Sequence, residues 1–179
     1  MKRTFLKIIS AVTAAVLLLC GCNNNNEAPE NVERRFSYGD LDYALIADNI
    51  YDEISVDSLT MGSVAKVEDE TVLTEQYYLD LNNLNGYEVR SAEGKFGVAD
   101  VAILWVKEDC GNAVMDSLQN RKDDRIAEFI DYNVYNSYET AVNADIYQEG
   151  ELVVMLMLND EDKAIAKGII DSYLLEHQL

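Results

Sequence analysis

The sequence is poor in the residues on which many enzyme centres depend. Its 179 residues include three cysteines, one histidine, one tryptophan and one proline. The histidine, His177, lies close to the C-terminus, where chains usually fray, so a Ser-His-Asp triad or a zinc site would depend on a poorly held group. Glycine-rich phosphate loops and CxxC motifs are also absent. We therefore expect no cofactor and no metal site.

Positive charge is scarce as well. There are 14 basic and 33 acidic residues, and the formal net charge is −19. A protein without a basic face is a poor ligand for DNA or RNA, so we exclude nucleic acid as a partner. The acidic surface also repels anionic lipid headgroups. The excess of acid either serves solubility or attracts a cationic partner or a divalent metal.

The first residues have the pattern of an export signal. A positively charged start precedes residues 8–19, which are apolar apart from Ser10 and Thr13. This run is shorter than the roughly 20 residues that a membrane-spanning helix needs, which favours a cleaved signal peptide. The basic residues of the start are Lys2, Arg3 and Lys7.

The apolar run ends in a sequence similar to the cleavage box of bacterial lipoproteins. Leu19, Cys20 and Gly21 precede Cys22, and the small Gly21 directly before Cys22 places the cut. Such signals are cleaved before the cysteine, which carries a diacylglycerol and further acyl chains such as palmitate. We therefore predict a signal peptide over residues 1–21 and a lipid anchor on Cys22, at the extracytoplasmic face of the cell membrane. An ordinary secretory signal cut nearby is the alternative.

The predicted mature chain has a short tether and one domain. Residues 22–36 are rich in asparagine, contain the single proline and show no apolar period, so they predict a flexible linker. Removal of the signal takes the formal net charge to −22, because three basic residues and no acidic ones leave with it. Cys110 then remains as the only unacylated cysteine, so no internal disulfide can form. We expect one domain over residues 37–179.

Hydrophobic periodicity predicts helices and two strand pairs in the domain. Asp40 and Asp109 are the expected N-caps of the first and third helices, and the charged run 121–125 is the expected solvated face of the third. Residues 93–95 are the expected turn of the first hairpin, and Gly150 suits the turn of the second. The expected helices cover residues 41–54, 70–79, 110–130, 132–142, and 160 onwards. The expected strands cover residues 86–91, 98–106, 144–148 and 152–158.

This order predicts the α+β class. Strands joined by tight turns favour an antiparallel sheet, here of about four strands, with helices packed on one face. The run from Val101 to Val106 is apolar on both faces, so we expect it in a central strand.

Three further features are candidates for a site. Cys110 lies at an expected helix N-terminus, but Glu108 and Asp109 oppose thiolate formation, so we expect an inert thiol. The acidic runs 68–70 and 159–162 lack the glycine of a calcium loop. Tyr132, Tyr135 and Tyr138 recur every three residues. They could form the half-buried edge of a helix or an aromatic surface that binds a partner.

The element order behind the lipoprotein signal resembles the family called domain of unknown function 4358. These are small lipoproteins, mostly of Gram-positive bacteria, and the resemblance covers about residues 41–173. It implies a fold and a location but no chemistry. The matching residues are the Tyr78-Leu79 pair, residues 99–103 at the start of the central strand, Leu118 and Arg121, Tyr132, and residues 144–153 with Gly150.

These observations favour a lipid-anchored binding domain without enzymatic activity. Its partner would be a protein, a peptide or a cell-wall component. A cell-envelope hydrolase that uses carboxylates is the alternative, and a structural spacer is a third possibility. Paired carboxylates in a deep cleft would favour the hydrolase, whereas an exposed tyrosine surface would favour binding.

Overall fold

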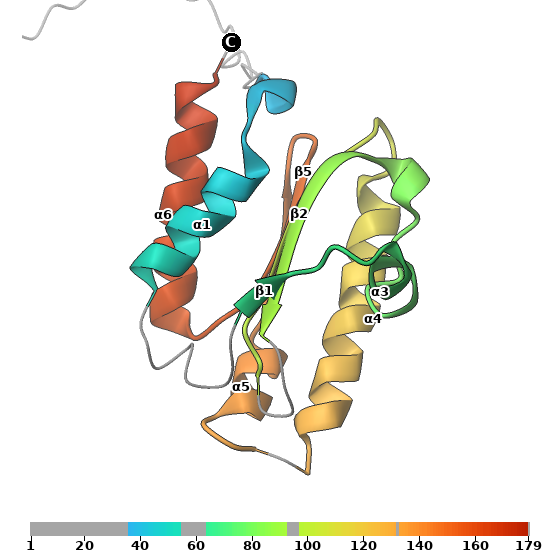
Figure 1. Ribbon diagram of the computed structural model, residues 1–179, viewed down its shortest axis with the longest axis vertical. Coiled ribbons are helices and arrows are strands. Elements are labelled where there is room, and N and C mark those ends of the chain that lie inside the picture. The colour runs from blue at the N-terminus through green and yellow to red at the C-terminus, as the bar shows by residue number, and fades with distance from the viewer. Residues whose placement is uncertain (1–35, 55–63, 93–96, 132, 179) are drawn as a thin grey trace, which may run out of the picture. The chain divides into compact units, whose positions relative to one another are not determined.

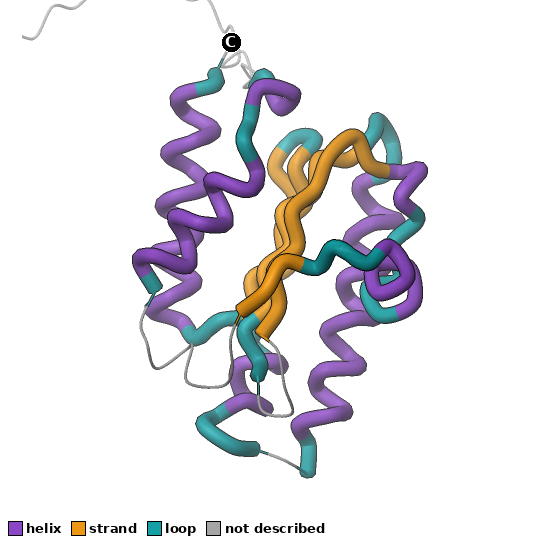
Figure 2. The backbone as a smooth tube through the Cα atoms, viewed as in Figure 1, coloured by secondary structure: helices purple, strands orange, loops and turns teal. Residues whose placement is uncertain are grey.

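The described part of the protein is a three-layer sandwich of helices around one sheet. The structure is a computed structural model, and it describes residues 36–54, 64–92, 97–131 and 133–178. The predicted signal peptide, most of the predicted linker, the expected turn at residues 93–95 and Tyr132 lie outside these residues. Arg34–Leu179 forms one compact unit, and Figures 1 and 2 show its sheet edge-on between two layers of helices. A unit with its own core can fold by itself.

Helices and strands alternate in groups along the chain. The helices are α1 (Tyr43–Glu53), α3 (Glu70–Glu75), α4 (Gly111–Phe129), α5 (Ser137–Val142) and α6 (Asp160–Glu176), with short 3₁₀ turns at Tyr38–Asp40 and Leu81–Asn83. The strands are β1 (Val64–Lys66), β2 (Leu84–Ala92), β3 (Asp100–Val106), β4 (Asp145–Glu149) and β5 (Leu152–Met157).

The strands form one antiparallel sheet in the order β1-β2-β3-β5-β4. The prediction that the apolar run of β3 is central is confirmed, since β3 pairs with β2 on one side and β5 on the other. The predicted hairpin of β4 and β5 is also present, with Glu149 opposite Leu152. Gly150 adopts the positive φ of 57° that the turn requires. A Cβ at Gly150 would lie 1.9 Å from the Tyr38 hydroxyl oxygen. The backbone conformation and the close approach of Tyr38 therefore both favour glycine.

Both faces of the sheet are covered by helices. Figure 1 shows α1 and α6 on one side and α3 and α4 on the other. One core cluster, between the sheet and α1 with α6, includes Ile46, Ile50, Val101, Ile103, Val154, Leu156, Ala166 and Ile170. The second, between the sheet and α3 with α4, includes Leu73, Ala102, Leu104, Val114, Leu118, Val153 and Met155. A third, smaller cluster includes Val98, Phe129, Ala141 and Met157.

The α+β class and the antiparallel sheet are confirmed, but two details differ from the expectation. The described sheet has five strands rather than about four, and the helices lie on both faces rather than on one. The reason is that every residue of β5 is buried, and all residues of β3 except Trp105 are buried. Strands that are apolar on both faces need cover on both faces.

Two helix starts also differ. The cap of α1 is Asp42, whose carboxylate accepts a hydrogen bond from the Leu45 backbone nitrogen at 3.0 Å, whereas Asp40 lies in a 3₁₀ turn. Cys110, not Asp109, precedes α4, and Asp109 has a positive φ of 64°. In both cases the observed cap lies one or two residues after the expected one, and local sequence patterns resolve helix starts only to within one or two residues.

Candidate functional site

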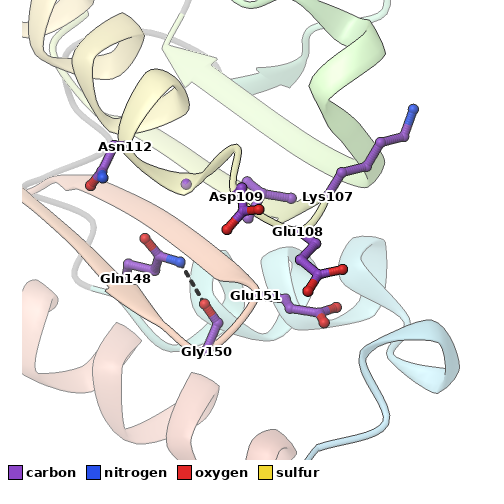
Figure 3. A pocket seen from close by; sticks show the side chains of 9 residues that line it. Lys107, Glu108, Asp109, Asn112, Gln148, Gly150 and Glu151 are labelled. Atoms are coloured by element: carbon purple, nitrogen blue, oxygen red, sulfur yellow. Dashed lines mark hydrogen bonds between the residues drawn. The ribbon is translucent and has the colours of Figure 1, made fainter.

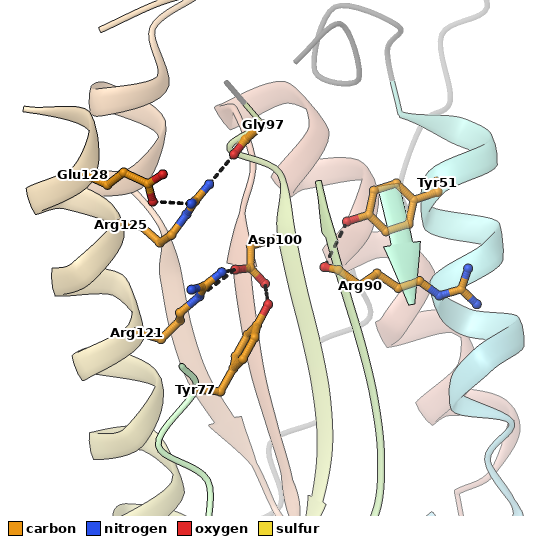
Figure 4. A network of polar contacts seen from close by, with 8 residues as sticks. All are labelled: Tyr51, Tyr77, Arg90, Gly97, Asp100, Arg121, Arg125 and Glu128. Carbon is orange, nitrogen blue, oxygen red and sulfur yellow. Dashed lines mark hydrogen bonds and ion pairs between the residues drawn. The ribbon is translucent and has the colours of Figure 1, made fainter. Parts of the chain in front are cut away.

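A buried charged network crosses the interface between β3 and α4. Asp100 is fully buried at the start of β3 and faces Arg121 of α4. The Nε and Nη2 atoms of Arg121 each lie 3.1 Å from Oδ2 of Asp100. The Tyr77 hydroxyl donates to Asp100 Oδ1 at 2.8 Å, and the Arg121 guanidinium lies 4.4 Å from the centre of the Tyr77 ring. Figure 4 shows Tyr77 and Arg121 converging on Asp100. This network joins β3, α4 and the segment after α3 inside the fold.

The pKa shifts follow from this burial. Desolvation raises the pKa of the Asp100 carboxyl, and the Arg121 guanidinium opposes that rise without cancelling it. Burial also raises the pKa of the Tyr77 hydroxyl, which keeps it protonated as a donor. Desolvation alone would lower the pKa of Arg121, but Asp100 and Tyr77 together outweigh it and the net shift of the Arg121 pKa is upward. The arrangement holds a charged pair in place, and Asp100 itself has no exposed surface.

The expectation that run 121–125 is solvated is wrong for its arginines. Arg121 and Arg125 are each 8% exposed. Arg125 lies one turn further along α4, donates to the Gly97 carbonyl oxygen and pairs with Glu128, and its guanidinium lies 4.6 Å from the Phe129 ring centre. Both arginines lie on the stripe of α4 that carries its buried residues Val114, Leu118 and Phe129.

A second buried carboxylate is likewise engaged within the fold. Glu88 of β2 is 2% exposed and pairs with Lys66 of β1 at 3.0 Å and with Arg90 at 2.7 Å. Arg90 also reaches Asp48 of α1 at 2.7 Å. The contacts tie an edge strand and a helix to β2, so Glu88 has a structural role.

A polar pocket lies beside the β4–β5 turn, and its lining includes the two neighbours of Cys110 in the chain, Asp109 and Gly111. It has a volume of about 330 Å³ and is drawn in Figure 3. Its charged side chains come from the segment after β3 and from the turn, and they include Lys107, Glu108, Asp109 and Glu151. Glu151 accepts a hydrogen bond from the Trp105 indole nitrogen at 2.8 Å. The charged lining residues are three acids and one lysine, and this composition alone identifies no ligand.

Cys110 and His177 lie in separate settings. The Cys110 thiol is half-buried and donates to Asn83 Oδ1 at 3.6 Å. His177 follows the last turn of α6, with its Nδ1 2.8 Å from the Tyr173 carbonyl oxygen. The described structure thus pairs neither group with a partner that would activate a nucleophile.

Replacing Cys110 by serine should therefore change stability little. Serine is a preferred residue before a helix and keeps a donor for Asn83. We expect the free energy of unfolding to change by less than about 1 kcal/mol. Urea unfolding of both proteins measures this. A loss of partner binding in a folded Cys110→Ser protein would show that the thiol is functional.

The tyrosines expected to form a row do not share one environment. Tyr135 is 68% exposed, whereas Tyr138 is half-buried against the third core cluster; Tyr132 lies outside the described residues. Tyr135 and Asn136 both adopt left-handed backbone conformations, with φ of 55° and 62°, directly before α5. Because residues 133–136 are not helical, the three-residue spacing does not produce one continuous stripe.

Searches for metal and membrane features within the described residues were negative. No group of three or more His, Cys, Asp or Glu side chains there could hold a metal ion. Among the helices of that part of the chain, none is both long and apolar enough to cross a membrane.

Comparison with known families identified one match. Residues 57–158 match the model of a family described as domain of unknown function DUF4358. No curated protein and no solved structure matched the chain.

Proposed function

The chain belongs to the DUF4358 family, and we propose that it is a lipid-anchored, extracytoplasmic domain that binds a protein, peptide or cell-wall component without catalysing a reaction. The anchor would be Cys22, in the box formed with Leu19, Cys20 and Gly21. Two or three acyl chains hold a protein stably at a membrane. The tether of residues 22–36 would then present the domain to its partner.

The binding proposal rests on the exposed position of Tyr135. A left-handed backbone is costly for a tyrosine, and such strain persists where the surrounding structure imposes it. The surroundings include Asn133, whose side chain accepts from the Tyr138 backbone nitrogen at 3.2 Å and donates to Glu139 at 3.0 Å. The result is a tyrosine residue that is 68% exposed to solvent. Exposed tyrosines on rigid backbones are frequent anchors in protein interfaces.

The hydrolase alternative has weaker support: Glu108, Asp109 and Glu151 line the pocket beside the β4–β5 turn, but Glu151 accepts the hydrogen bond of the Trp105 indole nitrogen. Asp100 and Glu88 are buried carboxylates, and each is paired with cationic side chains inside the fold. A glycosidase-type mechanism needs two carboxylates facing a cleft that the substrate can enter. The proposal therefore assigns these two acids to stability.

Replacing Tyr135 by asparagine should weaken recovery of the partner about tenfold or more, since asparagine tolerates the left-handed backbone while removing the ring. Tyr135→Phe is the matched control, because it keeps the ring and should retain most binding. The measurement is crosslinking of the membrane-anchored protein in cells, followed by quantitative mass spectrometry. Equal recovery of every specific partner with Tyr135→Asn would exclude this loop. The absence of any specific partner would favour the spacer.

A further inference from the structure

A groove runs between helices α1 and α6 on the outer side of one helical layer. The two helices lie side by side in Figure 1, and the Asn49 side chain donates to the Tyr173 hydroxyl across them at 2.6 Å. The groove has a volume of about 630 Å³. Its lining residues are Asn49, Asp52 and Glu53 of α1 and Ile165, Gly168, Ile169, Ser172 and Tyr173 of α6.

The floor of the groove is largely apolar and has room at Gly168. Ile165, Ile169 and Tyr173 are half-buried, with the remainder of each side chain facing out. Gly168 is helical, and a Cβ built there has no atom within 4 Å. Glycine inside a helix costs stability relative to alanine, and neither close packing nor a positive φ requires it here. The glycine keeps the floor open at the expense of helix stability.

The rim at the end of α1 is acidic. Asp52 and Glu53 lie in the last turn of α1, which has no basic residue. Helix C-termini carry partial negative charge, so carboxylates there are unfavourably placed. The basic residues of the first half of α6 are engaged elsewhere: Lys167 pairs with Asp145 of β4 at 2.7 Å, and Lys163 pairs with Asp160 at 3.0 Å. None of the lining residues is basic. A cation bound at this rim would relieve two unfavourable interactions.

We propose that this groove binds a cationic amphipathic segment of a partner protein. Apolar side chains of that segment would contact Ile165, Gly168 and Ile169, and its lysine or arginine side chains would face Asp52 and Glu53. Helical segments commonly dock in this way, through apolar residues at helical spacing. The negative net charge of the chain would speed association and disfavour anionic competitors.

The charge of the rim argues against other occupants. Residues 55–63, which follow α1, contain an aspartate and no basic residue. A second copy of this acidic chain would bring further negative charge to the same place. The proposed segment uses none of the tyrosines near α5, so this groove and the Tyr135 loop are separate sites.

The direct test uses a defined peptide and the domain Arg34–Leu179. The probe is a fluorescent peptide of about four helical turns, made of leucine and lysine with the leucines at helical spacing. Its controls carry glutamate in place of lysine, or alanine in place of leucine. Binding is measured by fluorescence anisotropy at low and physiological salt, and the site is mapped by NMR shifts of backbone amides.

Two variants remove separate parts of the groove. Gly168→Gln fills the floor with a good helix former, and Asp52→Asn with Glu53→Gln neutralises the rim. Each should weaken binding of the leucine-lysine peptide by about fivefold or more. The matched control, Asp116→Asn with Glu75→Gln, removes two exposed acids from α4 and α3 and should change the affinity less than about twofold. Gly168→Ala should raise the melting temperature by about 2 °C, which verifies the helix cost.

Groove-specific losses in both variants, weaker binding at higher salt, and amide shifts centred on α1 and α6 would support the proposal. Equal losses in the control variant, or shifts elsewhere, would overturn it. Two further results would overturn it, because each identifies another occupant of the groove. One is a shift of the groove amides when residues 55–63 are replaced by a glycine-serine segment. The other is a dimer of the domain that dissociates in the Gly168→Gln variant. Peptide binding is expected to survive Tyr135→Asn, so failure of one proposal leaves the other testable.

Discussion

Replacing Asp100 by alanine should cost about 3–5 kcal/mol of the free energy of unfolding. The change leaves the Arg121 guanidinium, whose side chain is 10% exposed, without its carboxylate partner. It also removes the acceptor of the Tyr77 hydroxyl, whose burial makes an unsatisfied donor expensive. Urea denaturation followed by circular dichroism measures the loss.

A double variant tests whether the cost comes from the orphaned charge. Asp100→Leu combined with Arg121→Met replaces the ion pair with apolar side chains, and should cost clearly less than Asp100→Ala alone. Asp116→Ala, an exposed change on α4, should stay within about 0.5 kcal/mol. A loss below about 1 kcal/mol for Asp100→Ala would mean that water already solvates Arg121, and it would remove the structural role assigned to this network.

The sequence contains a signal for the burial of Arg121 and Arg125, but their charge favours the opposite interpretation. Val114, Leu118, Arg121, Arg125 and Phe129 follow one another at intervals of three and four, which is the spacing of a single helix face. Charged residues are usually exposed, which is why the sequence alone predicts a solvated face for this run. The periodicity alone places the two arginines on the buried face. There Arg121 pairs with Asp100, and Arg125 donates to the Gly97 carbonyl oxygen.

The strands were predictable where apolar residues are continuous. The central position of β3 and the hairpin of β4 and β5 follow from runs such as 101–106 and from Gly150. By contrast, β1 has three residues and gains its pairing from β2, so its own sequence carries little signal. Which face each helix covers is decided by tertiary packing of two-sided strands, and helical periodicity does not encode it.

The two candidate surfaces, the Tyr135 loop and the α1–α6 groove, also depend on features of the fold that the sequence does not reveal. The exposure of Tyr135 depends on two consecutive left-handed residues, and tyrosine is an uncommon residue in that conformation. The groove between α1 and α6 required the packing of two helices more than 100 residues apart, as the contact between Asn49 and Tyr173 illustrates. Its sequence signals were the mid-helix Gly168 and the acidic last turn of α1, each of which is uninformative alone.

Replacing Cys22 by alanine should abolish acylation, an all-or-none change. The proposed diacylglycerol attaches through the Cys22 thiol, which alanine lacks, and the acidic mature chain has little attraction for anionic headgroups. We expect the protein to remain unprocessed or to be released from the membrane fraction. Fractionation, together with the mass of the N-terminal peptide, provides the measurement.

Cys20→Ala is the matched control, because it removes a neighbouring thiol and keeps Gly21 directly before Cys22. It should leave cleavage and acylation intact, whereas loss of both would assign the anchor to Cys20. An unmodified Cys22 in the native membrane protein would contradict the anchor and favour an ordinary secretory signal. In that case the domain would act in solution, and a partner bound through Tyr135 or the α1–α6 groove would have to be sought there rather than at the membrane surface.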